Sequence, residues 1–404
     1  MATTANRSTS HDLDSAAKGS APASRRLMSL DVLRGLTIAF MIMVNNNGGP
    51  GAWKEMNHAA WNGFTATDLV FPTFLFVVGV SLVFSTEARL RRGATRRQLA
   101  WHTLVRAVIL FALGVVVNNF PYFHWVHMRF YGVLQRIAIC YLIVGLFYLW
   151  DRRVWTKVAL LFAVLIGYWA LVRWVPVPGA GMPERDVPLL DKNQNIVAWV
   201  DRQLMPGHLY EDRPAHDARD PEGLLSDIPA LGTALLGLLA GLWLSGRRQV
   251  KEKALGLAAG AAICLATGYF WSIWFPLNKK MWTSSYVLVA AGWSLAIFAL
   301  AFWLVEQRGW GKAGWTRVFT WPGLVFGSNA IAAYMISELL PGTLSFIHLN
   351  DGARRVNPLF YANHHFFTFI TDPGWRAFAY SVSYTFVCFV PVWLLYRRKI
   401  FIKI

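Results

Sequence analysis

Long apolar segments recur along almost the whole chain, and they constrain its fold more than any other feature. Each is close to the ~20 residues that a helix needs to cross a bilayer. Ten such segments can be placed. They cover residues 28–45, 67–86, 99–117, 131–150, 155–174, 229–245, 254–272, 283–304, 320–340 and 376–396. The sequence therefore predicts an all-α polytopic membrane protein with about ten transmembrane helices.

Basic residues gather in alternate connections between these segments. The connections are RLRRGATRRQ, DRRVWTK, SGRRQVKEK and EQRGWGKAGWTR, followed by the tail YRRKIFIKI. By the positive-inside rule these ends are cytoplasmic, so both termini are predicted to be cytoplasmic. The net charge of +17 then reflects topology and contact with membrane lipid. No soluble basic face with interleaved aromatics is evident, which argues against a nucleic-acid partner.

Two regions lie outside the pattern of spans. Residues 1–27 are polar, rich in Ser, Ala and Thr, and lack the apolar core of a signal peptide, so we expect a disordered cytoplasmic tail. Residues 175–228 form one long outer loop that holds 10 of the 22 acidic residues. Its length and composition predict irregular structure. It is either a lid over a site or a solvated acidic surface.

The three cysteines carry no redox or metal signal. Cys140, Cys264 and Cys388 all fall within predicted spans, with neither metal-ligand nor disulfide spacing. We expect them to pack as small apolar side chains. No metal site is predicted.

The stretch MNHAAWNGFTATDLVFPTFLF, residues 56–76, places polar residues where a span begins. Thr65 and Asp68 have the spacing of a capping box for the following helix. That spacing does not explain His58, which precedes the helix in an outer loop between Trp53 and Trp61. This histidine either helps to anchor the loop at the membrane interface or acts as a base in catalysis.

Other polar side chains are expected at the same outer side. Asn45 ends the first span before NNGGPG, where it either caps the helix or donates a hydrogen bond to an oxyanion. Polar groups at membrane depth are costly unless they are paired or line a wet cavity. The outer ends of other spans bring Gln135, Arg136, Lys279 and Glu338. We therefore expect a polar cavity that opens outward.

Further polar residues, which are candidates for binding a cofactor, lie in the spans toward the predicted cytoplasmic side. Asp31 and Arg34 lie three residues apart on one helix face, so Arg34 either pairs with Asp31 or meets a phosphate. Arg106 lies deeper in its span than a lipid-contacting arginine normally does, and it could bind the phosphates of a cytosolic cofactor. Asn329 lies deeper still, and it either faces the cavity or bonds a neighbouring helix.

Six segments carry a resemblance to a known family. In chain order they are SLDVLRGLTIAFMIMVN, HAAWNGFTATDLVFPTFLFVVGVSL, GVLQRIAICY, DPEGLLSDIPALGTALLG, PLNKKMWTSSYVL and GSNAIAAYMISE. Together they resemble heparan-alpha-glucosaminide N-acetyltransferase and its bacterial NagX-type relatives. The resemblance implies that residues 28–404 form one transmembrane acyltransferase domain.

The same resemblance implies a reaction, a location and two catalytic residues. Acetyl would pass from cytosolic acetyl-CoA to the amine of a glucosamine-type sugar on the periplasmic side of a bacterial inner membrane, in a homodimer. The active histidine of the family, in its H-A-x-W-N-G motif, matches His58, and its catalytic asparagine matches Asn45. Asp68 would orient His58 or hold the ammonium of the sugar.

Binding residues complete the prediction. We expect acetyl-CoA to contact Arg34, Arg106, Arg136 and Asn329. We expect the sugar to contact Trp61, Asn62, Gln135, Lys279 and Glu338. The alternative is a transporter of amino sugars or N-acetyl amino sugars, in which the outer cavity is a substrate site in alternating access.

Overall fold

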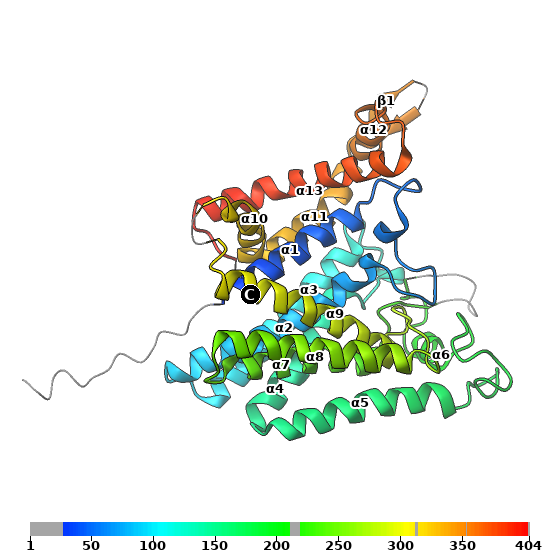
Figure 1. The fold of residues 1–404 in the computed structure, drawn as a ribbon. Coiled ribbons are helices and arrows are strands. Elements are labelled where there is room, and N and C mark those ends of the chain that lie inside the picture. Colours follow the sequence, from blue (N-terminus) through cyan, green and yellow to red (C-terminus); the bar gives the residue numbers. More distant parts are fainter. Residues whose placement is uncertain (1–26, 211–218, 312–313, 353, 403–404) are drawn as a thin grey trace, which may run out of the picture.

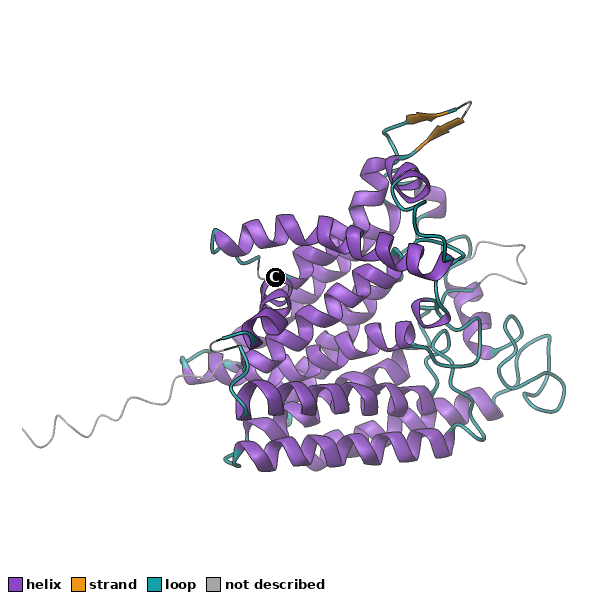
Figure 2. Ribbon diagram, turned by 45° about the horizontal axis from the view of Figure 1, so that its top comes forward, coloured by secondary structure: helices purple, strands orange, loops and turns teal. Residues whose placement is uncertain are grey.

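The computed structural model describes residues 27–210, 219–311, 314–352 and 354–402. Residues 1–26 of the predicted tail lie outside these ranges. Helices dominate the described residues, with one small antiparallel hairpin of β1 (Leu349–Asp351) and β2 (Arg354–Val356) (Figure 2). The predicted all-α fold is confirmed.

The longer helices are α1 (Met28–Asn45), α2 (Ala66–Arg91), α3 (Arg96–Asn119), α4 (Val133–Trp150), α5 (Val154–Trp174), α7 (Asp227–Ser245), α8 (Val250–Trp271), α9 (Ser284–Phe302), α10 (Thr316–Ser328), α11 (Ala330–Leu344) and α13 (Pro373–Arg397). The shorter ones are η1 (Lys54–Met56), η2 (Trp125–His127), α6 (Ile196–Leu204), the π-helical η3 (Trp303–Gln307) and α12 (Pro358–His365).

Nine helices among the described residues are long and apolar enough to cross a membrane, counting α9 with η3 as one. Two more, α10 and α11, pass that test only as a pair, and they are bent by 79° at their junction. The ten predicted spans are therefore found, but the segment 320–340 is broken. The chain is a multi-pass membrane protein.

The break lies at Asn329, whose backbone leaves the helical region at φ −132° and ψ 44°. Gly327 and Ser328 precede it, and both are weaker helix formers than alanine. The Asn329 amide group donates to the Ile400 carbonyl at 3.0 Å and accepts from the Ile402 N–H at 2.8 Å. The mainly apolar composition of residues 320–340 does not predict this bend. The backbone groups that bind the Asn329 side chain come from the other end of the chain.

Capping residues extend several helices beyond their apolar segments. α3 begins at Arg96 because Thr95 and Gln98 form a capping box. α13 begins at Pro373 because the Asp372 side chain accepts a hydrogen bond from the Trp375 N–H. Helix boundaries therefore follow polar caps and not only hydrophobicity.

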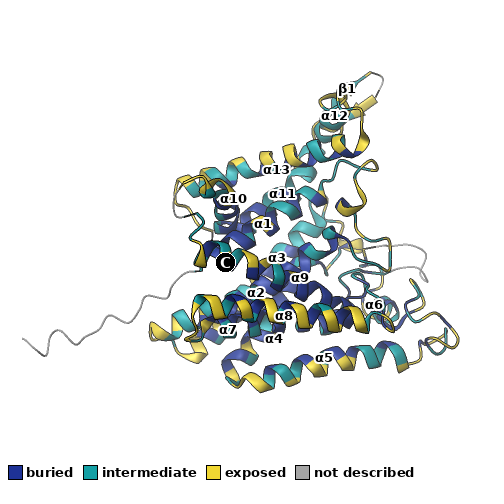
Figure 3. Ribbon diagram, in the orientation of Figure 1, coloured by how far each residue is buried: buried dark blue, intermediate teal, exposed yellow. Residues whose placement is uncertain are grey.

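The core lies among α1, α2, α4, α7 and α9, which are mostly buried, whereas only 22–28% of the spans of α3, α5, α8 and α13 is buried (Figure 3). The exposed residues of these outer helices are largely apolar, as lipid contact requires. Helices α2 and α7 approach closely. A Cβ added at Gly79 would lie 2.2 Å from the Ala234 carbonyl oxygen, and one at Gly237 would lie 2.1 Å from that of Phe76.

The helix bundle has two ends (Figure 1). We call the loop end the one that carries residues 46–65, 175–210, 219–226, 272–283, 345–352 and 354–372. The terminal end carries the start of α1 and the end of α13. Both ends of the described chain therefore lie on one side, as the predicted topology requires. Which side faces the cytoplasm remains a prediction.

The described part of the long outer loop contains more regular structure than its composition predicted. It contains α6, whose first turn is capped by the Asn195 side chain. Ile196 and Val197 pack in a second apolar cluster with Tyr168 of α5 and Met281. The described part of this loop therefore packs against α5 and the connection between α8 and α9. Its action as a lid remains a prediction.

Candidate functional site

The centre of the candidate site is a histidine–carboxylate pair at the loop end. His58 Nδ1 lies 2.8 Å from Asp68 Oδ1. The other carboxylate oxygen, Oδ2, accepts from the N–H of Thr65 and from that of Ala59, both at 3.1 Å. The predicted capping box is present, and the same Asp68 side chain also holds the histidine. Asp68 therefore both caps α2 and contacts His58, and its part in catalysis stays a prediction.

The pair fixes which nitrogen of His58 is available. An ionised carboxylate only accepts hydrogen bonds, so Nδ1 must carry the proton that it shares with Asp68. Nε2 then carries the lone pair of the neutral ring. The side chain of Asp68 is 1% exposed and that of His58 is 48% exposed. A buried carboxylate thus orients an accessible imidazole, as in many acid–base sites.

Lys279 completes this cluster. Its Nζ lies 3.1 Å from His58 Nδ1, 3.4 Å from His58 Nε2 and 3.8 Å from Asp68 Oδ1. Burial lowers the pKa of Lys279, and the negative charges of Asp68 and Glu222 partly oppose that effect. The structure brings this predicted sugar-binding residue directly to the imidazole.

The loop that carries His58 is held by the connection between α8 and α9. The Gly63 N–H donates to the Leu277 carbonyl at 2.8 Å, and Lys280 Nζ donates to the Ala60 carbonyl at 3.1 Å. Asn278 Nδ2 donates to Asn62 Oδ1 at 2.9 Å. These contacts fix the loop without using the ring nitrogens of His58.

Two predicted sugar-binding residues take part in this scaffold. Trp61 Nε1 donates to the Leu190 carbonyl of the outer loop at 2.7 Å, and Asn62 accepts from Asn278. Their sugar contact stays a prediction.

Asn45 and Glu338 form a second pair at the loop end. Asn45 Nδ2 lies 2.9 Å from Glu338 Oε1, which joins the last turn of α1 to α11. Among the described residues no hydrogen bond joins Asn45 to the His58–Asp68 pair. The structure therefore brings together two predicted site residues, one expected to stabilise an oxyanion and the other to bind sugar, in a separate pair.

Gln135 and Arg136 are both wholly buried. Arg136 Nε donates to Asp227 Oδ1 at 2.7 Å and Nη2 donates to the Gly223 carbonyl at 3.1 Å, so this guanidinium ties α4 to the start of α7. It lies in the first turn of α4, where it meets Gly223 and Asp227, whereas Arg34 lies in the second turn of α1. The Gln135 amide has no hydrogen-bond partner among the described residues.

The predicted cofactor residues at the terminal end have different surroundings. Arg34 Nη2 pairs with Asp31 Oδ1 at 2.7 Å, and Arg34 Nε donates to the Gly327 carbonyl at 2.9 Å. The Arg106 guanidinium lies 4.9 Å from the centre of the Tyr141 ring, and its buried Nε has no partner among the described residues. Asn329 holds the C-terminal segment. The structure does not bring these three side chains into one cluster.

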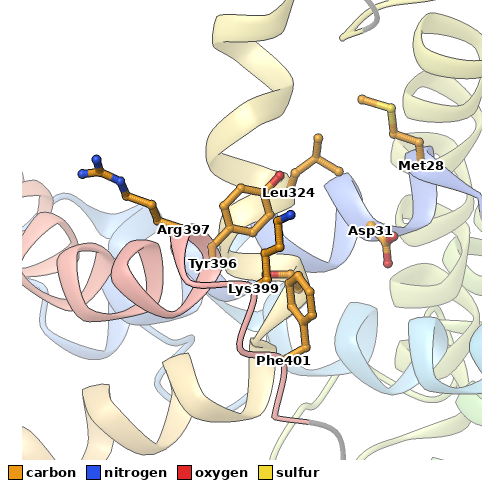
Figure 4. A pocket seen from close by; sticks show the side chains of 8 residues that line it. Met28, Asp31, Leu324, Tyr396, Arg397, Lys399 and Phe401 are labelled. Atoms are coloured by element: carbon orange, nitrogen blue, oxygen red, sulfur yellow. The ribbon is translucent and has the colours of Figure 1, made fainter.

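A cavity of about 570 Å³ lies at the terminal end between α1, α10 and the C-terminal segment (Figure 4). Tyr396, Lys399 and Phe401 line one side, and Met28 and Asp31 of α1 line the other. The remaining lining residues are Leu324, Ser328 and Arg397. Sequence reasoning missed the C-terminal residues because their basic charge was already explained by topology.

The helix bundle and the cluster of His58, Asp68 and Lys279 define the class of protein. It is a multi-pass membrane protein with an oriented histidine at the loop end of its bundle. Residues 26–178, which include His58 and Asp68, match the family model described as heparan-alpha-glucosaminide N-acetyltransferase, catalytic. Over most of its length the chain is similar to heparan-alpha-glucosaminide N-acetyltransferases, which confirms the predicted resemblance.

Two curated relatives carry that name. The human protein is 28% identical over 426 aligned positions, which cover 94% of this chain and 60% of the relative. The mouse protein is 28% identical over 372 positions, which cover 80% of this chain and 55% of the relative. The chain thus spans a little over half the length of these relatives.

Proposed function

We propose that the chain is an acetyltransferase that moves an acetyl group from acetyl-CoA to the amine of a glucosamine-type sugar. The observation that carries this proposal is the accessible imidazole of His58, oriented by buried Asp68, in a segment that matches a family named for amino-sugar N-acetylation. By the same resemblance, the proposed location is a bacterial inner membrane, with the sugar on the periplasmic side and the protein a homodimer.

The geometry of the histidine suits proton transfer from the acceptor. An amino sugar arrives largely as its ammonium form, and His58 Nε2 removes one proton from it. The amine lone pair then forms the C–N bond to the thioester carbonyl carbon. When the tetrahedral intermediate collapses, the C–S bond breaks and the sulfur takes the proton from Nε2. A second proton leaves the nitrogen to solvent.

Negative charge develops on the carbonyl oxygen during this attack. Lys279 Nζ, 3.4 Å from His58 Nε2, lies where an ammonium can stabilise that charge. Asn45 is kept as the oxyanion donor on the family resemblance, since its amide nitrogen has two hydrogens and Glu338 accepts one of them. No hydrogen bond among the described residues joins it to the His58–Asp68 pair. The proposal therefore keeps His58, Asp68 and Asn45 as catalytic residues and gives Lys279 a role next to the reacting carbonyl.

The donor would enter at the terminal end. The cavity there is lined by Arg397 and Lys399 and by the rings of Tyr396 and Phe401, which suits a phosphate-bearing nucleotide with an aromatic base. Helix α1 runs from this cavity to Asn45. The broken α10–α11 pair likewise runs from the cavity to Glu338. We propose that the slender arm of acetyl-CoA follows these two elements toward the loop end.

Transfer to a panel of amino sugars by the purified protein, measured with labelled acetyl-CoA, tests the proposed function. Label on the amine supports it. Uptake of unmodified amino sugar into sealed vesicles without acetyl-CoA, together with no transfer, supports transport instead. Incubation without acceptor separates two chemical routes, because label that remains on His58 indicates an acetyl-histidine intermediate.

The cavity gives a prediction about the donor. Replacing both Arg397 and Lys399 with alanine is expected to raise the KM for acetyl-CoA roughly 3- to 30-fold, since each removes one charge that can meet a phosphate. The kcat is expected to change little because neither residue contacts the histidine cluster. Initial rates over a range of acetyl-CoA concentrations provide the measurement.

Arg398→Ala is the matched control for that experiment. It removes one neighbouring positive charge, but Arg398 does not line the cavity. Its KM for acetyl-CoA should stay at the wild-type value. An unchanged KM in the double variant would place the nucleotide elsewhere.

A further inference from the structure

The segment that follows α13 turns sharply and crosses to the bend between α10 and α11. Lys399 adopts a left-handed backbone with φ 56°. Its N–H donates to the Tyr396 carbonyl at 3.0 Å, and the Ile400 N–H donates to the Leu395 carbonyl at 2.9 Å. A left-handed residue that lets such bonds form is a common way to end a helix. Residues 399–402, which we call the C-terminal strap, therefore leave the axis of α13.

Asn329, at that bend, clamps the C-terminal strap. Its side chain is wholly buried. The amide nitrogen donates to the Ile400 carbonyl at 3.0 Å, and the amide oxygen accepts from the Ile402 N–H at 2.8 Å. The two bonds run in opposite directions to backbone groups two residues apart, so they fix the register of the strap as a ladder pair in a β-sheet does. A side chain with only a donor or only an acceptor cannot make both bonds.

The C-terminal strap forms part of the wall of the cavity at the terminal end. Lys399 and Phe401 line that cavity, and both lie on the strap (Figure 4). The centre of the Phe401 ring lies 6.3 Å from that of Tyr396, which also lines the cavity. Asn329 itself is not among the lining residues. Its side chain therefore fixes the backbone that carries two cavity side chains without facing the cavity.

The bend between α10 and α11 has a separate support. Arg34 Nε donates to the Gly327 carbonyl at 2.9 Å. A Cβ added at Gly327 would lie 2.1 Å from the Asp31 carbonyl oxygen, so α1 packs directly against the end of α10. Neither contact involves the Asn329 side chain, whose two bonds go to the strap. Loss of the Asn329 amide therefore releases the strap and leaves the contacts of α1 with α10 in place.

We propose that Asn329 is a positioning residue for the donor site, which holds the C-terminal strap so that Lys399 and Phe401 face the nucleotide of acetyl-CoA. The inference rests on the proposed function, because it assumes that acetyl-CoA binds in this cavity. It gives Asn329 an indirect part in donor binding, through the strap, in place of the direct contact expected from the sequence. Side chains that are ordered before the ligand arrives lose less entropy on binding, so the clamp should affect the affinity for the donor.

Equilibrium binding of CoA to the purified full-length protein tests this inference, since CoA has the nucleotide but no acetyl group to transfer. Asn329→Ala and Phe401→Ala are each expected to weaken CoA binding about 3- to 10-fold. The double variant should bind CoA about as weakly as Asn329→Ala alone, because Phe401 loses its fixed place once the strap is released. Residues that act through one shared contact have effects that do not multiply.

Asn119→Ala is the matched control. Asn119 makes the same kind of clamp at the end of α3, where its amide donates to the Arg129 carbonyl at 3.0 Å and accepts from the Arg129 N–H at 2.9 Å. It does not line the cavity, so this variant should bind CoA as wild type does. Hydrogen exchange at the Ile402 N–H should become faster in Asn329→Ala and stay unchanged in Asn119→Ala. Asn329→Asp, which keeps the size and the acceptor for the Ile402 N–H, replaces Asn329→Ala if that variant does not fold.

Three outcomes would overturn the inference. In the first, Asn329→Ala binds CoA as tightly as wild type does. In the second, Phe401→Ala does so, which means that the strap does not contact the donor. In the third, the effects of the two substitutions multiply, which means that Asn329 acts on the donor independently of the strap. Failure of the proposed function looks different, because CoA binding would still depend on Asn329 while no amino sugar is acetylated.

Discussion

Replacing His58 with alanine is expected to reduce acetyl transfer about 100- to 10,000-fold, which is the usual contribution of a positioned general base. The His58 side chain is 48% exposed, so its removal deletes little packing. The Asp68 capping bonds to Thr65 and Ala59 do not involve the imidazole. The fold should therefore survive. Initial rates of N-acetylation by purified protein, at saturating acetyl-CoA, measure the effect.

The chain offers a second histidine–aspartate pair as a control. His365 Nε2 lies 3.0 Å from Asp351 Oδ1, but the side chains are 42% and 31% exposed and belong to the segment around the β-hairpin. Because that carboxylate is not buried, His365→Ala should retain wild-type activity. Substantial activity in His58→Ala, above about half of the wild-type rate, would remove the imidazole from the mechanism.

The structure shows which parts of the site are local in sequence. The capping spacing of Thr65 and Asp68 is readable because both residues begin one helix. The pairing of Asp68 with His58, ten residues apart in sequence, is not readable, because it depends on how the irregular segment before α2 turns back on the helix start. Lys279 contacts the same histidine although it lies 221 residues away in sequence. The sequence predicted only that both residues lie on the outer side of the membrane.

Features that depend on contacts between distant parts of the chain could not be predicted from the sequence. The bend at Asn329 lies inside an apolar stretch that reads as one span, and its polar partners come from residues 400 and 402. Apolar periodicity reports burial in lipid or protein, not the direction of a helix. The spans themselves were predictable for the opposite reason, since length and apolar composition alone determine whether a helix can cross a membrane.

Arg136 gives the second large prediction, which concerns stability. Its side chain is wholly buried, pairs with Asp227 at 2.7 Å and lies 4.8 Å from the centre of the Trp282 ring. Arg136→Met keeps a long apolar side chain but leaves the Asp227 carboxylate buried without its cation. Breaking a buried pair in this way typically costs about 3–5 kcal/mol. We expect the melting temperature of the detergent-solubilised protein to fall by roughly 5–15 °C.

Two further variants separate an ion-pair effect from a packing effect. Arg136→Met combined with Asp227→Leu should recover much of the lost stability, because replacing both partners with apolar groups removes the uncompensated charge. Arg152→Met is the matched control, since its partner Glu87 is 29% exposed and Arg152 itself is 34% exposed. Partly exposed pairs contribute about 0–1 kcal/mol, so this variant should melt within a few degrees of wild type. If Arg136→Met melts like Arg152→Met, or if the double variant is less stable than Arg136→Met alone, the guanidinium does not hold α4 to α7 through its charge.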